Sequence, residues 1–259
     1  MDEILKNFGL IFPEINRMLS YGILIFIRLL GFIRFAPIFN RKEIPGVIKL
    51  SFVFIIAVIL TIVLKPTKII TSESMLLQTV LNFVFGAMLG WMANCIVLAV
   101  ESGGDMINMQ MGVSSAQIMD PTTQGMVSLM GRLFSLISVL LFVQVGGVYW
   151  LFNALLRSFE IFPIFSYEFP LTKIFELTNI IKITSNLLYM GLQIASPVLL
   201  ATMGQDIILG VISKTAPQIN VFQLSFLFKP VFGVAILMWI MPILIDIIND
   251  YFTSYSNIF

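Results

Sequence analysis

The sequence has 259 residues, of which 58% are hydrophobic and 11% charged, whereas soluble domains average about 45–50% apolar and about 25% charged residues. This composition excludes an ordinary soluble domain and predicts an all-α membrane protein, because several apolar stretches reach the roughly 20 residues that a helix needs to cross a bilayer. The net charge of +1, with Lys and Arg dispersed along the chain, offers no basic surface for nucleic acid. We expect one domain over residues 1–259 and no nucleic-acid partner.

The chain contains no histidine and one cysteine, Cys95, which lies inside an apolar stretch. The lack of histidine removes the most common general base and metal ligand. A single cysteine can form neither a disulfide framework nor a thiolate metal site. We therefore expect no enzyme activity, no cofactor and no metal site.

The first apolar segment runs from Met18 to Phe39 and contains two arginines, Arg28 and Arg34. We expect its helix to stop near Pro37, because the residue before a proline disfavours the α conformation. An arginine within a membrane helix costs several kcal/mol on insertion scales, so it normally faces a protein interior, an aqueous cavity or a headgroup. The two arginines are six positions apart and therefore cannot share one narrow helical stripe.

Two further apolar segments follow. The second runs from Ile44 to Leu64 and carries one charge, Lys49. The third runs from Met75 to Val100 and contains Gly86 and Gly90 in a small-xxx-small arrangement. In membrane helices this spacing favours close helix packing.

A weakly hydrophobic interval, Glu101–Gly125, separates the third and fourth segments. It is rich in Gly, Ser, Gln and Met and contains no Lys or Arg. We predict a central loop over this interval. Composition by itself favours an ordinary surface loop over a functional one.

The fourth segment runs from Met126 to Leu156, with a Gly146-Gly147 pair at which the helix could bend or approach another backbone. A polar and aromatic connection is expected over Asn153–Phe169. Apolar residues at helical spacing then predict a short amphipathic helix over Leu171–Lys182.

The last two segments, Ile183–Gln205 and Val221–Ile245, enclose a polar joint, Met203–Asn220. We predict a helix–turn–helix at this joint. Lys229-Pro230 is expected to break the final segment into a short arm and a longer apolar run, because proline removes a helical hydrogen bond.

The charges in and beside these six segments require protein or water next to them. A secondary transporter of small solutes is the alternative interpretation, with Arg28, Arg34 and Asp206 lining a binding site. The positive-inside count does not decide the orientation of the segments. No P-loop occurs, so ATP hydrolysis is not expected of this chain.

Several stretches of the sequence resemble the FliR family of the flagellar export gate and its relatives in type III secretion injectisomes. The chain departs from the family at Val148, where histidine is common, and at Lys214, where arginine is common, although the positive charge is kept there. The resemblance is carried by Arg28-Leu-Leu-Gly31, Ala36-Pro37-Ile-Phe39, Glu101-Ser-Gly-Gly-Asp-Met-Ile-Asn-Met-Gln-Met-Gly112, Asp120-Pro121 and Gly210-Val-Ile-Ser-Lys-Thr-Ala-Pro217-Gln-Ile-Asn220-Val-Phe222.

This resemblance implies a structural and gating subunit of a protein-conducting export gate, built from bent helical hairpins within a larger helical pore assembly. Its partners would be FliP-type, FliQ-type and FlhB-type subunits and the exported polypeptides, in the bacterial inner membrane at the flagellar basal body. Residues 1–182 would form FliP-like hairpins, and residues 183–259 a FliQ-like hairpin. The charged and polar residues expected to serve assembly are Arg28, Arg34, Lys49, Asp206, Lys214, Pro217, Gln218, Asn220 and Lys229.

The resemblance also implies that the central loop 101–125 projects into the pore as a plug. Methionine side chains are flexible and unbranched and fill irregular gaps, as a compliant seal requires. Glycines would allow the backbone to hinge; those of the interval are Gly103, Gly104, Gly112 and Gly125. The expected plug residues are Met106, Met109, Met111, Gly112, Met119, Asp120 and Pro121.

Overall fold

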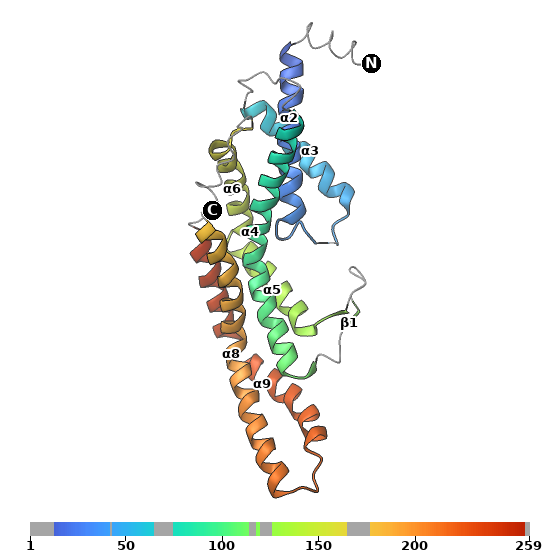
Figure 1. Cartoon of the computed structure of the whole chain (residues 1–259), viewed down its shortest axis with the longest axis vertical. Coiled ribbons are helices and arrows are strands. Elements are labelled where there is room, and N and C mark those ends of the chain that lie inside the picture. Colours follow the sequence, from blue (N-terminus) through green and yellow to red (C-terminus); the bar gives the residue numbers. More distant parts are fainter. Residues whose placement is uncertain are drawn as a thin grey trace. The chain divides into compact units, whose positions relative to one another are not determined.

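The computed structural model describes residues 13–41, 43–64, 75–113, 118–119, 126–164 and 177–256. The described chain is almost entirely helical (Figure 1), which confirms the all-α prediction. Two two-residue strands form one antiparallel pair, with Ile118 opposite Val127 and Met119 opposite Met126. In chain order the elements are α2 (Pro13–Phe35), α3 (Gly46–Leu64), α4 (Met75–Gln110), β1 (Ile118–Met119), β2 (Met126–Val127), α5 (Leu129–Gln144), α6 (Gly147–Ile161), α8 (Leu177–Thr215) and α9 (Val221–Ser256).

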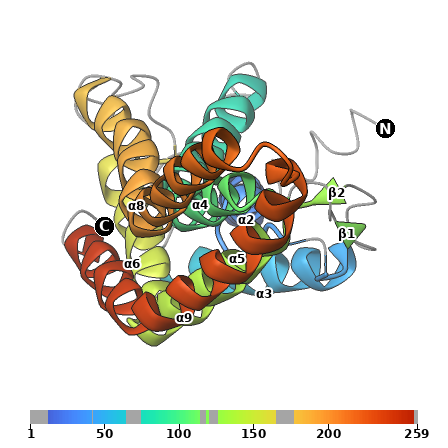
Figure 2. The ribbon, with the colours of Figure 1, turned by 90° about the horizontal axis from the view of Figure 1, so that it is seen from below.

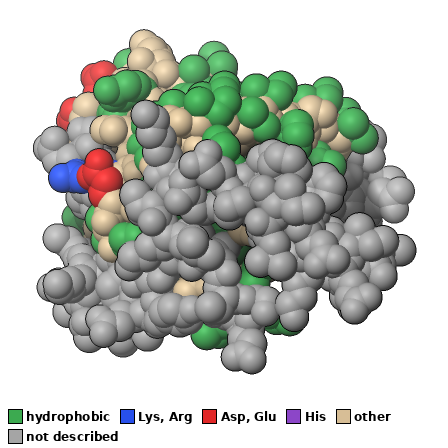
Figure 3. Space-filling model, turned by 90° about the horizontal axis from the view of Figure 1, so that it is seen from above, with side chains coloured by type: hydrophobic (Ala, Val, Ile, Leu, Met, Phe, Trp, Pro, Cys, Tyr) green, Lys and Arg blue, Asp and Glu red, His purple; other side chains and the backbone are tan. Residues whose placement is uncertain are grey.

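Five of these helices are long and apolar enough to cross a membrane, and the bent pair α5–α6 could supply a sixth crossing. This agrees with the prediction of about six hydrophobic segments. Where side chains are described in Figure 3, hydrophobic ones predominate and charged ones form a small group.

The chain divides into two compact units. The first unit consists of Met1–Asn94 with Leu151–Asn179, and the second of Cys95–Trp150 with Ile180–Phe259. Helices α4, α6 and α8 each contribute residues to both units. The division of the chain at residue 182 stays a prediction.

In the first unit, α2 ends at Phe35, directly before Ala36-Pro37 as predicted. The chain then turns and α3 packs against α2, with the rings of Phe26 and Phe54 in an edge-to-face arrangement 6.5 Å apart. The turn contains Ile38 at φ 72°. Phe39, which follows it, stacks on Phe52 of α3 at 5.6 Å.

Glycines let the backbones of α2 and α4 approach closely in this unit. A Cβ atom at Gly86 would lie 3.1 Å from the backbone nitrogen of Phe32, and one at Gly90 would lie 2.9 Å from that of Ala36. From the other helix, a Cβ at Gly31 would lie 3.0 Å from the nitrogen of Ala87. The small-xxx-small prediction for Gly86 and Gly90 is therefore confirmed as a site of helix packing.

In the second unit, α4 continues to Gln110, so the prediction of a loop is wrong for the first ten residues of the 101–125 interval. The reason is tertiary packing on the two glycines. A Cβ at Gly103 would lie 3.0 Å from the carbonyl oxygen of Gly191 in α8, and one at Gly104 would lie 2.7 Å from that of Met130 in α5. Burial of α4 against two helices offsets the roughly 1 kcal/mol that each glycine costs a helix.

The predicted bend at Gly146-Gly147 is confirmed, since α5 ends at Gln144 and α6 begins at Gly147. Gly146 adopts φ +85°, a conformation that favours glycine. However, α6 continues to Ile161, so the polar connection predicted from Asn153 is wrong over its first part. Residues 162–164 follow α6 outside any helix, as predicted, and the rest of the predicted connection, from residue 165, lies outside the described residues.

The last two helices form the predicted helix–turn–helix. Helix α8 ends at Thr215, and α9 begins after Asn220, whose side-chain oxygen accepts a hydrogen bond from the Gln223 backbone nitrogen at 3.3 Å. Asn220 thus caps the N-terminus of α9. Within the described residues, the separate helix predicted over 171–182 is wrong, because residues 177–182 are the first turns of α8.

The predicted break at Lys229-Pro230 is also wrong. Helix α9 runs through both Pro230 and Pro242. It curves along its length (Figure 2). Proline is tolerated within long apolar helices when neighbouring groups satisfy the freed backbone carbonyl, and α5 packs against α9 in this unit.

Candidate functional site

In the first unit, the side chain of Arg28 donates four hydrogen bonds. Its side chain is fully buried. Nε and Nη2 donate to Oδ1 of Asn82 on α4, at 2.9 and 2.6 Å. Nη1 donates to the carbonyl oxygen of Ser158 at 3.0 Å, and Nη2 also donates to that of Phe162 at 2.8 Å. Arg28 therefore links α2 to α4 and to the C-terminal end of α6.

Aromatic rings complete the surroundings of the guanidinium group. Its central carbon lies 4.5 Å from the ring centroid of Phe159 and 5.2 Å from those of Phe85 and Phe162. Cation–π attraction at these distances favours the charged form, as does the negative end of the α6 dipole. The sequence left a protein interior, an aqueous cavity and a headgroup open as surroundings of Arg28, and the structure shows a protein interior. The partners of Arg28 were not predicted.

The other two basic residues predicted in this unit have different surroundings. Arg34 is exposed, and its Nη1 reaches Oδ1 of Asn40 only at 3.5 Å. Lys49 donates from Nζ to the carbonyl oxygen of Arg41 at 2.7 Å, across the α2–α3 turn. The structure does not bring these residues together with Arg28 into one binding site.

An ion pair links the two helices of the α8–α9 hairpin. Nζ of Lys229 lies 2.7 Å from Oδ1 of Asp206. Both side chains are partly accessible, at 21% and 42%. The structure thus connects two of the predicted charges. Lys214, near the end of α8, is exposed.

The tip of the hairpin presents the remaining predicted polar residues. Pro217, Gln218 and Asn220 are all exposed in the turn between α8 and α9. The turn is closed by backbone hydrogen bonds from Ala216 to Ile212 at 2.8 Å and from Ile219 to Ala216 at 3.0 Å. Capping by Asn220 is therefore the one local role that the structure assigns in this group.

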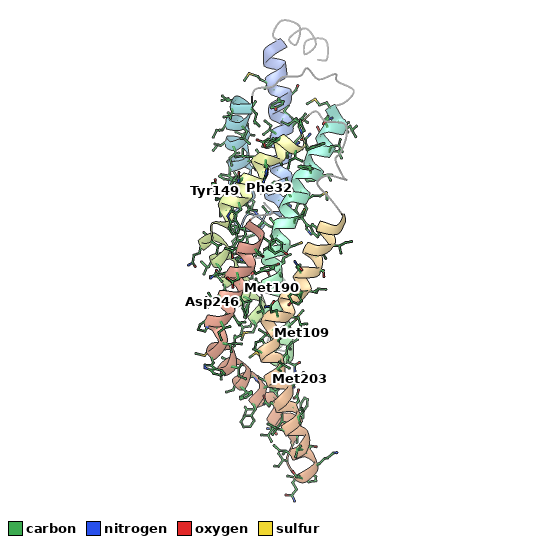
Figure 4. All side chains as sticks on the ribbon, turned by 90° about the vertical axis from the view of Figure 1, so that its left-hand side faces the viewer. Phe32, Met109, Tyr149, Met190, Met203 and Asp246 are labelled. Atoms are coloured by element: carbon green, nitrogen blue, oxygen red, sulfur yellow. The ribbon has the colours of Figure 1, made fainter. Side chains whose placement is uncertain are left out.

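The predicted plug residues divide into three groups. Met106 and Met109 lie on the last turns of α4, and Met109, labelled in Figure 4, is exposed. Met111 is fully buried, and a Cβ at Gly233 of α9 would lie 2.7 Å from its Cγ atom. Met111 thus belongs to the core of the second unit. Gly112 follows at φ +70°, where the chain leaves the helix.

The third group lies beyond this exit. Met119 belongs to β1, and its backbone pairs with Met126 of β2. Asp120 and Pro121 lie outside the described residues. The antiparallel pair places β1 beside β2, two residues before α5 begins at Leu129.

Three residues at the base of this segment were not predicted. Oγ of Ser128 donates a hydrogen bond to Oδ1 of Asp105 on α4. The same oxygen accepts from the backbone nitrogen of Gly131 at 2.9 Å and caps α5. A serine before an apolar run is a recognisable helix start, but no sequence signal indicates that Asp105 contacts it from 23 positions away.

The solute-transporter interpretation gains no support from this geometry. It required Arg28, Arg34 and Asp206 to line a binding site, but Arg28 uses Nε, Nη1 and Nη2 for protein acceptors. Asp206 is paired with Lys229. Among the described residues, no group of three or more Cys, Asp or Glu side chains could hold a metal ion.

The α8–α9 hairpin carries a large exposed apolar surface. Side chains of this size are costly in water, and contiguous exposed apolar surface marks contact with protein or membrane. The most exposed members are Phe222 at 82%, Trp239 at 81%, Met238 at 72%, Leu200 at 71% and Ile207 at 70%.

Comparison with known proteins shows similarity to bacterial export proteins along most of the chain. The family described as "Bacterial export proteins, family 1" matches residues 19–255. The chain is 26% identical to the flagellar biosynthetic protein FliR of Bacillus subtilis (strain 168) over 233 residues, which cover 89% of this chain and 90% of that protein. It is 25% identical to the FliR of Escherichia coli (strain K12), covering 90% and 88%. It is also 26% identical to the surface presentation of antigens protein SpaR of Shigella flexneri, covering 82% of each.

Proposed function

The chain belongs to the bacterial export proteins of family 1, and we propose that it is a structural and gating subunit of the protein-conducting export gate of a flagellar type III secretion system. The observation that carries this proposal is the match over residues 19–255, together with similarity to FliR proteins along about 90% of the chain. The subunit has no catalytic role in this proposal. Exported polypeptides pass through the gate, and the chemical work is done by other components.

The proposed setting is the bacterial inner membrane at the flagellar basal body. Five helices long and apolar enough to span a membrane support a membrane location. The buried Arg28 is compatible with that location, because its four hydrogen bonds within the protein reduce the cost of placing a charge among apolar helices.

The proposed partners are FliP-type and FliQ-type subunits, with an FlhB-type neighbour. Support comes from the exposed apolar surface of the α8–α9 hairpin, which its own chain leaves uncovered. In the proposed assembly, residues 1–182 take the place of FliP-like hairpins and residues 183–259 that of a FliQ-like hairpin. The ion pair between Lys229 and Asp206 links the two helices of this hairpin.

We further propose that the segment between α4 and α5 plugs the resting pore. The segment leaves α4 at Gly112 and returns at Ser128, and Met109 lies exposed at its base. A closed export pore must exclude ions but later admit an unfolded polypeptide. Flexible methionine side chains suit a seal of that kind.

Deletion of residues 112–125 tests the plug. The expected result is increased ion leakage through membranes that contain the assembled complex, measured as conductance in planar bilayers, with unchanged recovery of the partner subunits. The matched control replaces the same residues with a Gly/Ser linker of equal length, which keeps the connection between α4 and α5. A tight membrane after deletion, with the complex intact, contradicts the plug.

A further inference from the structure

We propose that the hairpin of α2 and α3 binds an anionic phospholipid, with the lipid phosphate held by Arg34 and Lys49 and the acyl chains lying along the outer face of α3. The inference goes beyond the proposed export function, since it requires only that the chain is a membrane protein. All the residues concerned belong to the first unit, in which α3 lies beside α2 (Figure 1).

Two basic side chains lie at the turn between these helices. Arg34 is in the last turn of α2, and Lys49 is in the first turn of α3. Their side chains bond to consecutive residues of the turn: Nη1 of Arg34 lies 3.5 Å from Oδ1 of Asn40, and Nζ of Lys49 donates to the carbonyl oxygen of Arg41 at 2.7 Å. Both positive charges are therefore held at the same end of the hairpin.

These charges favour an anionic ligand. Arg34 and Lys49 are near enough for their positive charges to repel each other, and Glu43 offsets only part of the charge. Among the residues that the structure describes, neither basic side chain takes part in an ion pair. An anion beside both would be attracted by each of them. A phosphate suits the pair, because a guanidinium fork matches phosphate oxygens and an ammonium group donates to them.

The face of α3 that points away from α2 is apolar and exposed. The buried residues Val53, Ala57, Leu60 and Thr61 form one stripe, and a Cβ at Gly22 of α2 would lie 3.1 Å from Oγ1 of Thr61. After Lys49, the large exposed side chains in the first half of α3 are those of Leu50, Phe54, Ile55, Val58 and Ile59.

The composition of this face favours lipid over a partner helix. Contacts between membrane helices are enriched in small residues, but the small residues Ala57 and Thr61 lie on the buried stripe. The hydroxyl of the exposed Ser51 already donates to the carbonyl oxygen of Val47, at 2.9 Å. By contrast, α8 carries Gly204 and Gly210, where a Cβ would meet nothing within 4 Å and a partner backbone has room to approach.

The length of the apolar face matches one leaflet of a bilayer. A helix rises 1.5 Å per residue, so the stretch from Leu50 to Ile59 extends about 15 Å. The hydrocarbon core of a bilayer is about 30 Å thick, and one leaflet supplies half of it. A lipid whose phosphate lies at Arg34 and Lys49 therefore has acyl chains of the right length to cover this stretch.

Lipid binding to the full chain, purified with its co-purifying subunits in a neutral detergent, tests the proposal. The two probes are dioleoyl phosphatidylglycerol and dioleoyl phosphatidylcholine, which share their acyl chains and differ in net charge. Native mass spectrometry measures the bound fraction of each during a titration. We expect phosphatidylglycerol to bind on the order of tenfold more tightly, because two basic residues contribute to its affinity.

Substitutions assign this preference to the basic pair. Arg34→Gln and Lys49→Gln should each weaken phosphatidylglycerol binding about fivefold, the effect of one basic residue near an anionic lipid surface, and leave phosphatidylcholine binding unchanged. Arg34→Lys and Lys49→Arg keep the charge and should bind nearly as the wild type does. Arg157→Gln is the matched control, because Arg157 is an exposed arginine of the same unit, on α6.

A photoactivatable phosphatidylglycerol, with a diazirine in the middle of an acyl chain, locates the bound lipid. Crosslinks mapped by peptide mass spectrometry should fall within residues 50–59 and decrease in Arg34→Gln. Crosslinks confined to other segments would overturn the proposal. A co-purifying subunit that crosslinks to Leu50–Ile59 in place of lipid would do the same and assign this face to a protein partner.

The binding titration can also reject the proposal. Equal affinity for the two lipids, or a preference for phosphatidylglycerol that both glutamine variants retain, means that Arg34 and Lys49 do not hold the headgroup. Inorganic phosphate should not displace phosphatidylglycerol, because it lacks acyl chains; displacement would reduce the pair to a site for small anions. None of these results bears on the proposed export function, which the deletion of residues 112–125 tests separately.

Discussion

At the scale of single residues, Arg28 shows how a charged side chain is accommodated among apolar helices. Its three nitrogen positions donate to the Asn82 side chain and to two carbonyl oxygens near the end of α6, and three phenylalanine rings surround it. Asn82 is itself held, since its Nδ2 donates to the carbonyl oxygens of Gln78 at 2.8 Å and Ile164 at 3.2 Å. The site is a structural link within the first unit.

We predict that Arg28→Ala destabilises the protein by roughly 3–5 kcal/mol, because it removes the two donors to Oδ1 of the buried Asn82 and leaves a cavity where the side chain was fully buried. The measurement is denaturant unfolding of the complex in detergent. Arg34→Ala is the matched control, since Arg34 is exposed with one long hydrogen bond of 3.5 Å, and its effect should stay within about 0.5 kcal/mol. If the two substitutions lowered the free energy of unfolding equally, the buried hydrogen bonds of Arg28 would not contribute to the stability of the protein.

At the scale of elements, glycines determine how closely the helices pack. In the first unit Gly31, Gly86 and Gly90 allow α2 and α4 to touch through their backbones. In the second unit Gly103 and Gly104 do the same for α4 against α8 and α5. Two of the four glycines that we expected to act as hinges, Gly103 and Gly104, are therefore packing positions.

Gly86→Ala should cost about 1–3 kcal/mol, the usual range for overpacking, because its Cβ would overlap the backbone of Arg28. The unfolding midpoint of the purified complex measures this loss. Gly204→Ala, in a helix but with open space around the new Cβ, should be neutral or stabilising. If both variants have the same unfolding midpoint, the close contact between α2 and α4 does not require glycine at position 86.

At the scale of the whole molecule, the α8–α9 hairpin exposes apolar side chains that its own chain does not cover. Phe222 and Trp239 are 82% and 81% exposed, whereas Leu237, two positions before Trp239, is 4% exposed. The outward residues contribute little to the fold of the chain itself. Their burial must come from partner subunits or lipid.

If partner subunits cover this surface, Trp239→Ser will lower the recovery of FliP-type and FliQ-type subunits with the tagged chain, while the helical content of the chain stays unchanged. Leu237→Ala is the contrasting variant, and should destabilise the chain by about 2–5 kcal/mol through a cavity. Co-purification and circular dichroism measure the two effects. Full recovery of partners with Trp239→Ser would assign this surface to lipid instead.

The sequence by itself determined the class of the fold and some of the places where helices end or bend. Apolar length predicted the membrane-type helices, Pro37 predicted the end of α2, and the Gly146-Gly147 pair predicted the bend before α6. The polar joint predicted the α8–α9 turn. These features depend on local propensity and on hydropathy, which a short stretch of sequence contains in full.

Only the tertiary structure decided which residues meet. It extended α4 through Gly103-Gly104, carried α9 through Pro230, and paired Arg28 with Asn82 and Asp105 with Ser128. The physical reason is that a buried contact compensates a poor local propensity or an unfavourable charge, and its partner lies far away in the chain. A short stretch of sequence contains neither the distant partner residue nor the stabilising contact that it makes.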